Sequence, residues 1–249
     1  DINYYYPTSV LVTGQDIIFF WVARMIMAGM EYQHEKPFSD VYFTGMVRDK
    51  LGRKMSKSLG NSPDLLMLIH EYGADAVRFG IMISSPAGND LLFDESSLEQ
   101  GKHFNNKLWN AMKLLKMWEE GGKQEAQSSE QFAIVWFENR LNEVRAEVDT
   151  LMSQFRLSEA LKTIYSLIWD DFCSWFLEWV KPEFGKAIEQ ETYERAVSFF
   201  DELLQMLHPF MPFITEEIYH LLKERNDDLV IKQFSSVEKA NKEILILGN

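Results

Sequence analysis

Residues 40–60 read DVYFTGMVRDKLGRKMSKSLG, and this stretch decides how the N-terminal part of the chain is interpreted. Its first eight residues, 40–47, are rich in β-branched and aromatic side chains, which is typical of a buried strand. A turn at Leu51-Gly52 follows, and then the polar run KMSKS at 54–58. A glycine-flanked polar loop after a buried strand is where nucleotide phosphates sit in doubly wound α/β folds. We therefore expect a phosphate site on this loop.

The loop is basic although the chain as a whole is acidic. Five cations face one carboxylate there, giving a local charge of +4 against −13 for the whole chain; they are Arg48, Lys50, Arg53, Lys54 and Lys57, with Asp49. A positive loop on an acidic protein favours a local anion, and triphosphate is the expected one. Lys57 would neutralise charge on a departing pyrophosphate, with Lys54 assisting. The predicted ATP-binding loop comprises Lys54, Met55, Ser56, Lys57 and Ser58, and the alternative is a solvated basic turn.

Upstream of this loop the sequence predicts one βαβ unit. Residues 8–13 have the β-branched, apolar pattern of a buried parallel strand, and residues 16–30 show helical periodicity. With the strand at 40–47 they form strand, helix and strand, joined by a right-handed crossover. One such unit is half of a doubly wound sheet. We therefore expect an exposed edge and apolar surface, and self-association of the chain.

Four residues at the start of the predicted helix are candidate ligand contacts. Gly14 ends the first strand, where a ligand can approach the backbone, and Asp16 can accept a hydrogen bond from a ribose hydroxyl. The alternative for Asp16 is helix N-capping together with Thr13. Ile17 and Trp21 lie one turn apart and could form the apolar wall of an amino-acid pocket. Their alternative is ordinary core packing.

The rest of the chain is predicted to be helical. A short helix opens at Asp64 and closes at Gly73, and the chain is irregular over 84–93. Further amphipathic helices are expected at 74–83, 99–119, 132–152, 157–180, 191–207 and 212–225, with a polar linker at 121–131. This is the pattern of an antiparallel helix bundle. The predicted fold is mostly α: a partial Rossmann-type α/β unit, the second half of a nucleotide-binding sheet, followed by an antiparallel α-helix bundle.

Composition narrows the class of protein. The 249 residues include one cysteine, Cys173, so no internal disulfide can form and a reducing, cytoplasmic setting is expected. Neither a membrane span nor a signal peptide is predicted. The five histidines show no metal-ligand spacing, so no metal site is expected. The tryptophans Trp169, Trp175 and Trp179 are interpreted as core and helix-contact aromatics, and 208–213 as a buried corner between helices.

Taken together, these runs resemble the class I aminoacyl-tRNA synthetases. The matching runs are LVTGQDIIFFWVARM at 11–25, DVYFTG at 40–45, KMSKS at 54–58, YGADAVRF at 72–79, GND at 88–90, FNNKLWNA at 104–111 and HPFMPFITEE at 208–217. Within the family, DIIFFW at 16–21 resembles the branch that takes valine. An isoleucine or leucine type stays open as an alternative.

The resemblance implies roles for the candidate residues. Gly14 and Asp16 would hold the ribose of ATP, the Lys57 loop its phosphates, and Ile17 and Trp21 the valine side chain. Mg²⁺ would travel with ATP, and the partners would be ATP, valine and its tRNA, with no DNA and no membrane. The residues that contact tRNA stay unknown.

The resemblance also implies a division of the chain. Residues 1–62 would be the second half of the catalytic domain, 63–100 a stem-contact segment and 101–249 the anticodon-binding bundle. The family's first signature, a His-Ile-Gly-His-type loop, and its editing domain have no counterpart in these residues. We therefore expect a piece of a longer enzyme that is inactive alone. Two other hypotheses stay open: a non-catalytic helical tRNA-binding module, and a helical scaffold with an accidental basic loop.

Overall fold

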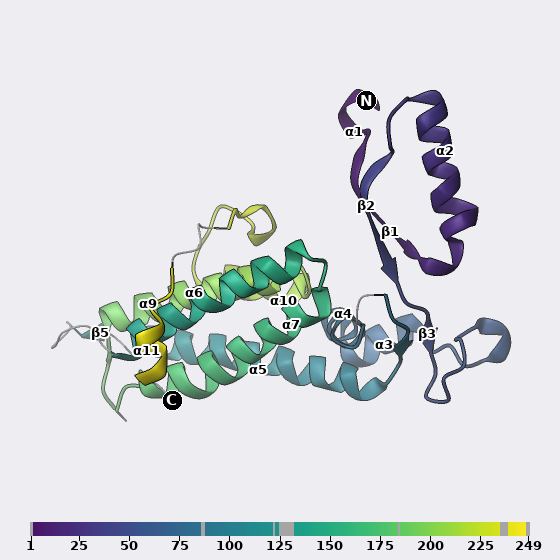
Figure 1. Cartoon of the computed structure of the whole chain (residues 1–249). Coiled ribbons are helices and arrows are strands. Elements are labelled where there is room, and N and C mark those ends of the chain that lie inside the picture. The colour runs from purple at the N-terminus through teal and green to yellow at the C-terminus, as the bar shows by residue number, and fades with distance from the viewer. Residues whose placement is uncertain are drawn as a thin grey trace.

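The computed structural model describes residues 2–85, 88–121, 123–124, 132–183, 185–234 and 239–247. Figure 1 shows a small α/β lobe at the N-terminal end of an elongated helical body. The fold is mostly helical with small parallel sheets, which confirms the predicted class.

The lobe contains the predicted strand–helix–strand unit. Strand β1 (Thr8–Gly14) pairs in parallel with β2 (Phe38–Thr44), in register from Thr8↔Phe38 to Gly14↔Thr44. The connection differs from the regular helix expected at 16–30. It opens with a 3₁₀ turn, η1 (Gln15–Ile17), continues as a π-helix, η2 (Ile18–Val22), and becomes α-helical only in α2 (Ala23–Tyr32). A four-residue helix, α1 (Ile2–Tyr5), precedes β1.

The strand predicted at 40–47 is broken at Gly45. Strand β2 ends at Thr44, and Val47–Arg48 form a separate strand, β3, that pairs in parallel with β4 (Leu91–Leu92). At the break the 88–90 segment packs directly against Gly45, where a Cβ would lie 1.7 Å from the backbone oxygen of Asn89. The chain therefore changes sheets where the 88–90 segment crosses it.

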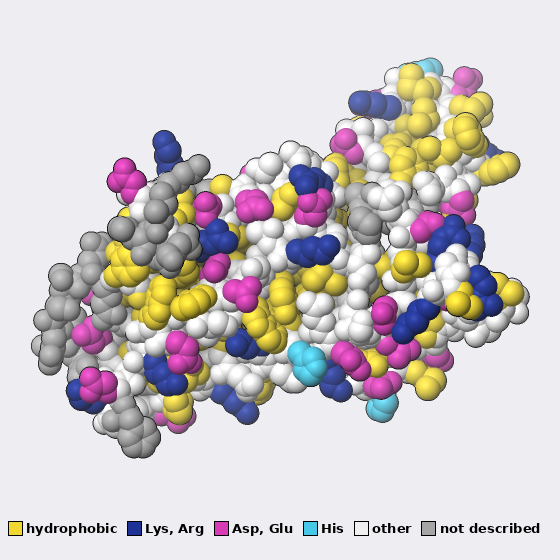
Figure 2. Space-filling model, turned by 60° about the horizontal axis from the view of Figure 1, so that its bottom comes forward, with side chains coloured by type: hydrophobic (Ala, Val, Ile, Leu, Met, Phe, Trp, Pro, Cys, Tyr) yellow, Lys and Arg dark blue, Asp and Glu magenta, His cyan; other side chains and the backbone are white. Residues whose placement is uncertain are grey.

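Much of the lobe's apolar surface is exposed. Phe19, Phe20 and Met27 are 80%, 78% and 70% exposed, and Figure 2 shows hydrophobic side chains gathered over the lobe. Among the described residues, β1 and β2 pair only with each other, so the sheet has two open edges. These features agree with half of a larger sheet, and self-association remains a prediction.

Two helices connect the lobe to the bundle. Helix α3 (Leu65–Tyr72) begins where predicted, because the Asp64 carboxylate accepts from the backbone N–H groups of Leu66 and Met67 at 2.8 and 3.4 Å. Gly73, at φ 89°, ends it, and α4 (Ala74–Ile83) follows and packs along α5.

The bundle follows the predicted helices closely. It comprises α5 (Glu95–Glu120), α6 (Phe132–Ser153), α7 (Leu157–Ser166), the π-helix η4 (Leu167–Phe176), α8 (Leu177–Trp179), α9 (Gln190–Leu207) and α10 (Pro212–Leu222). The short elements β5 (Lys123–Gln124), β6 (Ile188–Glu189), η5 (Leu229–Ile231) and α11 (Lys242–Leu247) were not predicted. In the core, Phe137 lies 4.9–5.3 Å, centroid to centroid, from the rings of Phe172, Phe176 and Phe199. Most of the predicted linker at 121–131 lies outside the described residues.

Two details of the bundle differ from the sequence interpretation. Trp169 packs against the core, and Trp179, although 41% exposed, lies 5.1 Å, centroid to centroid, from the Trp136 ring on α6, so it is a helix-contact aromatic. Trp175 is 54% exposed, and its assignment to the core was wrong. Trp169 and Trp175 both lie in the π-helix η4, where a separation of six residues places Trp175 on a different face from Trp169. In the corner at 208–213, Phe210 and Met211 are buried as expected, whereas Phe213 is exposed. Among the described residues, no helix combines the length and apolar character that crossing a membrane requires.

Candidate functional site

The basic loop at 49–61 folds back on strand β3. The Met55 N–H donates to the Val47 carbonyl at 3.0 Å, and Arg48 and Lys54 form an antiparallel bridge. Two positive-φ glycines allow the reversals, Gly52 at 75° and Gly60 at 65°. In Figure 1 the loop projects beyond β3 and away from the helical body. The lysines thus lie on an exposed excursion with a fixed base.

Asp49 organises that base. Its Oδ1 accepts from the backbone N–H groups of Leu51 and Arg53 at 3.0 and 2.9 Å. Its Oδ2 accepts from the Asn61 amide at 3.0 Å and from the Arg53 guanidinium at 2.8 Å. The bonds from Asn61, and next those from Arg53, hold the pKa of Asp49 well below its ordinary value. This carboxylate therefore stays ionised and keeps both ends of the loop together.

Ser56 also serves the loop's structure. Its N–H donates to Asn61 Oδ1 at 2.9 Å, and its Oγ accepts from the Leu59 N–H at 3.3 Å. That second bond caps a 3₁₀ turn, η3 (Lys57–Leu59). Ser58 Oγ lies 3.1 Å from Ser56 Oγ, so the two hydroxyls are hydrogen-bonded to each other. The serines hold the turn that presents Lys57.

Four of the five cations of the loop form ion pairs with carboxylates, whereas Lys57 differs from them. Arg48 and Lys50 pair with Asp90 and Asp94, Arg53 pairs with Asp49, and Lys54 Nζ lies 3.8 Å from Asp16 Oδ2. Three of these carboxylates lie outside the loop, so the local charge is lower than the sequence indicated. Within the described part of the chain, Lys57 has no carboxylate partner. Its exposed ammonium group is the cation most available to an external anion.

A second carboxylate fixes where the loop starts. Asp90 Oδ1 accepts from the Met46 N–H at 2.9 Å, and its Oδ2 accepts from Arg48 Nε. These bonds, with that from Arg48 the larger influence, lower the pKa of Asp90. The GND run thus positions the strand that carries the loop, a role that the sequence did not reveal. The sequence showed Asp49 as the one acid in a basic segment, but not its structural role or its partner Asn61.

The ribose candidates lie at the carboxyl end of β1 and close to the loop. A Cβ on Gly14 would lie 2.7 Å from Asp16 Oδ1, so the carboxylate folds back over the glycine. No side-chain hydrogen bond caps η1, but Asp16 lies in its first turn, so the alternative that Asp16 stabilises the start of the helix stays open. Through the contact between Lys54 and Asp16, the structure brings the ribose candidate and the basic loop together.

The pocket candidates are placed differently from the expectation of a regular helix. Ile17 ends the 3₁₀ turn and Trp21 lies in the π-helix, with exposed fractions of 38% and 44%. Neither side chain is buried, so core packing does not account for them in this chain. Both follow the carboxyl end of β1, on the side of Asp16, and an apolar ligand could contact them there.

Comparison with known protein families gives two matches, which are separated by residues 95–134. Residues 1–94 match the model described as "tRNA synthetases class I (I, L, M and V)", and residues 135–246 match "Anticodon-binding domain of tRNA ligase". The chain is 56% identical over 247 residues to a valine–tRNA ligase of Phocaeicola vulgatus, covering 99% of this chain. The chain belongs to the valine–tRNA ligase family.

Other members of the valine–tRNA ligase family agree along the chain. Identity is 59% over 226 residues with the protein of Bacteroides thetaiotaomicron, covering 91% of this chain and 26% of that protein. It is 43% over 239 residues with that of Thermotoga maritima, covering 96% of this chain. The chain spans 28% of the length of the Phocaeicola vulgatus and Thermotoga maritima relatives.

Solved structures share the fold of this valine–tRNA ligase family chain. A ternary complex of LeuRS, tRNA and LeuAMS from Agrobacterium radiobacter K84 superposes with a TM-score of 0.72 at 22% identity, over 96% of this chain and 29% of that one. A methionyl-tRNA synthetase from Mycobacterium tuberculosis in complex with methionyl-adenylate gives 0.65 at 23% identity, over 86% and 44%. At these identities the likeness concerns the fold alone.

Proposed function

We propose that this chain is the part of an ATP-dependent valine–tRNA ligase that binds the nucleotide with its lobe and tRNA with its helical bundle. The observation that supports the lobe's role is the pairing of the loop's cations. Four of them have carboxylate partners, and Lys57 projects from a turn capped by Ser56 with no such partner among the described residues. A cation held in place but not neutralised suits charge that develops during a reaction.

The proposed roles follow the positions of the residues. Gly14 lets the nucleotide approach the backbone, and Asp16 accepts from ribose hydroxyls. Ile17 and Trp21 contact the valine side chain. A valine carboxylate oxygen attacks the α-phosphorus of ATP, and the bond to the departing pyrophosphate breaks, with Mg²⁺ accompanying the phosphates. Lys57, with Lys54 assisting, neutralises charge on the departing pyrophosphate, and the valyl group then passes from the adenylate to a hydroxyl of tRNA with release of AMP.

Within this scheme Lys54 and Lys57 act differently. Lys54 lies 3.8 Å from Asp16, so it links the loop to the ribose site. Lys57 supplies uncompensated positive charge to the leaving group. The division into residues 1–62, 63–100 and 101–249, and a cytoplasmic location, belong to the same proposal. The buried, free thiol of Cys173 agrees with that location.

The test is Lys57→Ala in the complete enzyme, measured by valine-dependent ATP–pyrophosphate exchange. We expect mainly kcat to fall, by about 2–4 kcal/mol of transition-state stabilisation, as for other preorganised electrostatic groups. Lys50→Ala is the matched control, because Lys50 lies on the same loop but pairs with Asp94 at 3.3 Å. Equal kinetics for the two variants would refute the role of Lys57.

The amino-acid assignment has its own test. Exchange driven better by isoleucine or leucine than by valine would contradict the valine assignment. A second candidate function, tRNA binding by this chain without catalysis, is favoured by the match of residues 135–246 to an anticodon-binding domain. Fluorescence anisotropy with the valine tRNA should show binding that weakens with salt, because phosphate contacts release counterions. Absence of binding at low salt would exclude it.

A further inference from the structure

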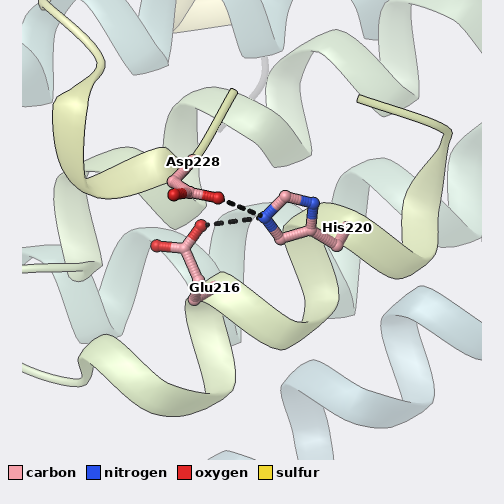
Figure 3. Close-up of side chains that lie close together, drawn as sticks. All are labelled: Glu216, His220 and Asp228. Atoms are coloured by element: carbon pink, nitrogen blue, oxygen red, sulfur yellow. Dashed lines mark hydrogen bonds and ion pairs between the residues drawn. The ribbon is translucent and has the colours of Figure 1, made fainter. Parts of the chain in front are cut away.

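Outside the nucleotide lobe, three ionisable side chains converge at one end of the bundle. Glu216 and His220 lie one turn apart on α10, and Asp228 immediately precedes η5. Figure 3 shows the imidazole edge of His220 directed between the two carboxylates. Its Nε2 lies 3.2 Å from Glu216 Oε1 and 3.2 Å from Asp228 Oδ1. One ligand atom from each residue lies within 4.8 Å of the other two.

The three side chains of this cluster cannot satisfy one another's hydrogen bonds without a further group. An imidazole Nε2 carries at most one hydrogen, so it cannot donate to both carboxylates with good geometry. When His220 is neutral, the cluster carries two negative charges. A divalent cation between the three groups would contact both carboxylates and the nitrogen lone pair, and would neutralise that charge.

The distances suit a transition-metal ion. Zinc bonds of about 2.0–2.2 Å to nitrogen and oxygen place tetrahedral ligand atoms about 3.3–3.5 Å apart. The two nitrogen–oxygen separations of 3.2 Å therefore require only small movements, and the two carboxylate oxygens, which lie within 4.8 Å of each other, would move together around the ion. One imidazole with two carboxylates is also a donor set that zinc and its neighbours accept, whereas calcium and magnesium prefer oxygen alone.

The carboxylate of Glu216 is already oriented by backbone N–H groups of η5. Its Oε1 accepts from the Leu229 N–H at 2.7 Å, and its Oε2 accepts from the Val230 N–H at 3.3 Å. Such outer contacts fix a ligand's position before the metal arrives. A hollow of about 480 Å³, lined in part by Glu216 and His220, leaves the cluster open to solvent.

We propose that Glu216, His220 and Asp228 bind one divalent transition-metal ion of the zinc class, which fastens η5 to α10. The fourth position is filled by water from the hollow. The sequence showed no metal-ligand spacing because Asp228 approaches through a turn of the chain, although the pair Glu216 and His220 has the i, i+4 spacing of helical ligands.

The experiment is calorimetric titration of ZnCl₂ into the metal-stripped 249-residue chain, with Co²⁺ absorption as a second readout. We expect one ion per chain, and an affinity lower by at least about tenfold in both His220→Gln and Asp228→Asn, which is the scale of losing even an outer-shell contact. His103→Gln, an exposed histidine on α5, is the matched control and should bind like the unchanged chain.

Hydrogen exchange distinguishes a fastening ion from a surface one. Added Zn²⁺ should slow amide exchange in residues 228–231 of the unchanged chain and leave it unaltered in the two ligand variants, whose folding is checked by circular dichroism. The proposal is overturned by absence of saturable binding, by binding that survives both substitutions, or by unchanged exchange at saturating zinc. Any of these would leave His220 as an ion-pair partner only.

Discussion

Replacing Asp75 by alanine should destabilise the bundle, because this side chain joins two helices far apart in sequence. Asp75 lies in the first turn of α4, and its carboxylate accepts from the N–H groups of Phe213 and Ile214, at 3.3 and 2.6 Å, in the first turn of α10. Pro212, ahead of them, has no N–H to satisfy. Only 5% of Asp75 is exposed, so water cannot easily replace the lost acceptor.

The magnitude follows from those two bonds. Removing an N-cap acceptor costs about 0.5–2 kcal/mol. Leaving a buried donor unsatisfied costs about 1–3 kcal/mol. The two effects overlap, since they concern the same N–H groups, so we expect the free energy of unfolding to fall by about 2–3 kcal/mol. Arg78 remains as a second link, donating to the carbonyls of Phe210 and Pro209 at 3.0 Å each.

Urea unfolding followed by circular dichroism measures this loss. Asp64→Ala is the matched control, because Asp64 also accepts from two backbone N–H groups, but it is exposed and caps only its own helix. We expect that control to cost about 1 kcal/mol or less. If Asp75→Ala costs no more than Asp64→Ala, the link between α4 and α10 does not stabilise the bundle.

The contribution of Asp75 to folding stability depends on pH. Burial raises the pKa of Asp75 above its ordinary value, although the two N–H bonds and Arg78 oppose the effect. A raised carboxyl pKa means that the folded state holds the proton more tightly than the unfolded state. The contribution is therefore present at low pH and is lost as pH rises through the folded pKa. Stability of the unchanged chain relative to Asp75→Asn should decline over that interval.

Two further predictions concern single positions. Gly45→Ala should destabilise the base of the loop by more than about 2 kcal/mol and speed its proteolysis, because the new Cβ would lie 1.7 Å from the Asn89 oxygen. Gly121→Ala, whose nearest contact would be 3.4 Å, is the control. Equal proteolysis rates for the two variants would contradict the steric argument. Burial raises the pKa of the Cys173 thiol to about 12, so alkylation at pH 8 should be slower by about a thousandfold in the folded chain than in urea; similar rates would show that the thiol is accessible.

Much of the helical architecture could be predicted because its signals are local. Asp64 and Gly73 mark the two ends of α3, and the structure has the cap and the positive φ that those residue types favour. The π-helix η4 was not predicted, because an apolar stretch with many aromatics looks alike at slightly different periods. Trp175 was misassigned for a related reason. Its residue type suggests burial, but its position on the helix determines which way its side chain faces, and that side chain is exposed.

The candidate site was predicted less completely because its supports join distant residues. The basic loop and Asp16 were recognisable from their types and their places after strands. The bonds from Asn61 to Asp49 and from Met46 to Asp90 span 12 and 44 residues, and no local pattern encodes them. The charge of the loop was overestimated for the same reason, since Asp90 and Asp94 arrive from another part of the chain.

The bond between Asp49 and Asn61 has a mechanical consequence for the basic loop. It holds the two ends of the loop together, and the hydrogen bond from the Ser56 N–H to Asn61 fixes the segment between them. Breaking the bond between Asn61 and Asp49 would leave the lysines themselves unchanged, but it would remove a contact that fixes the position of the loop that carries them.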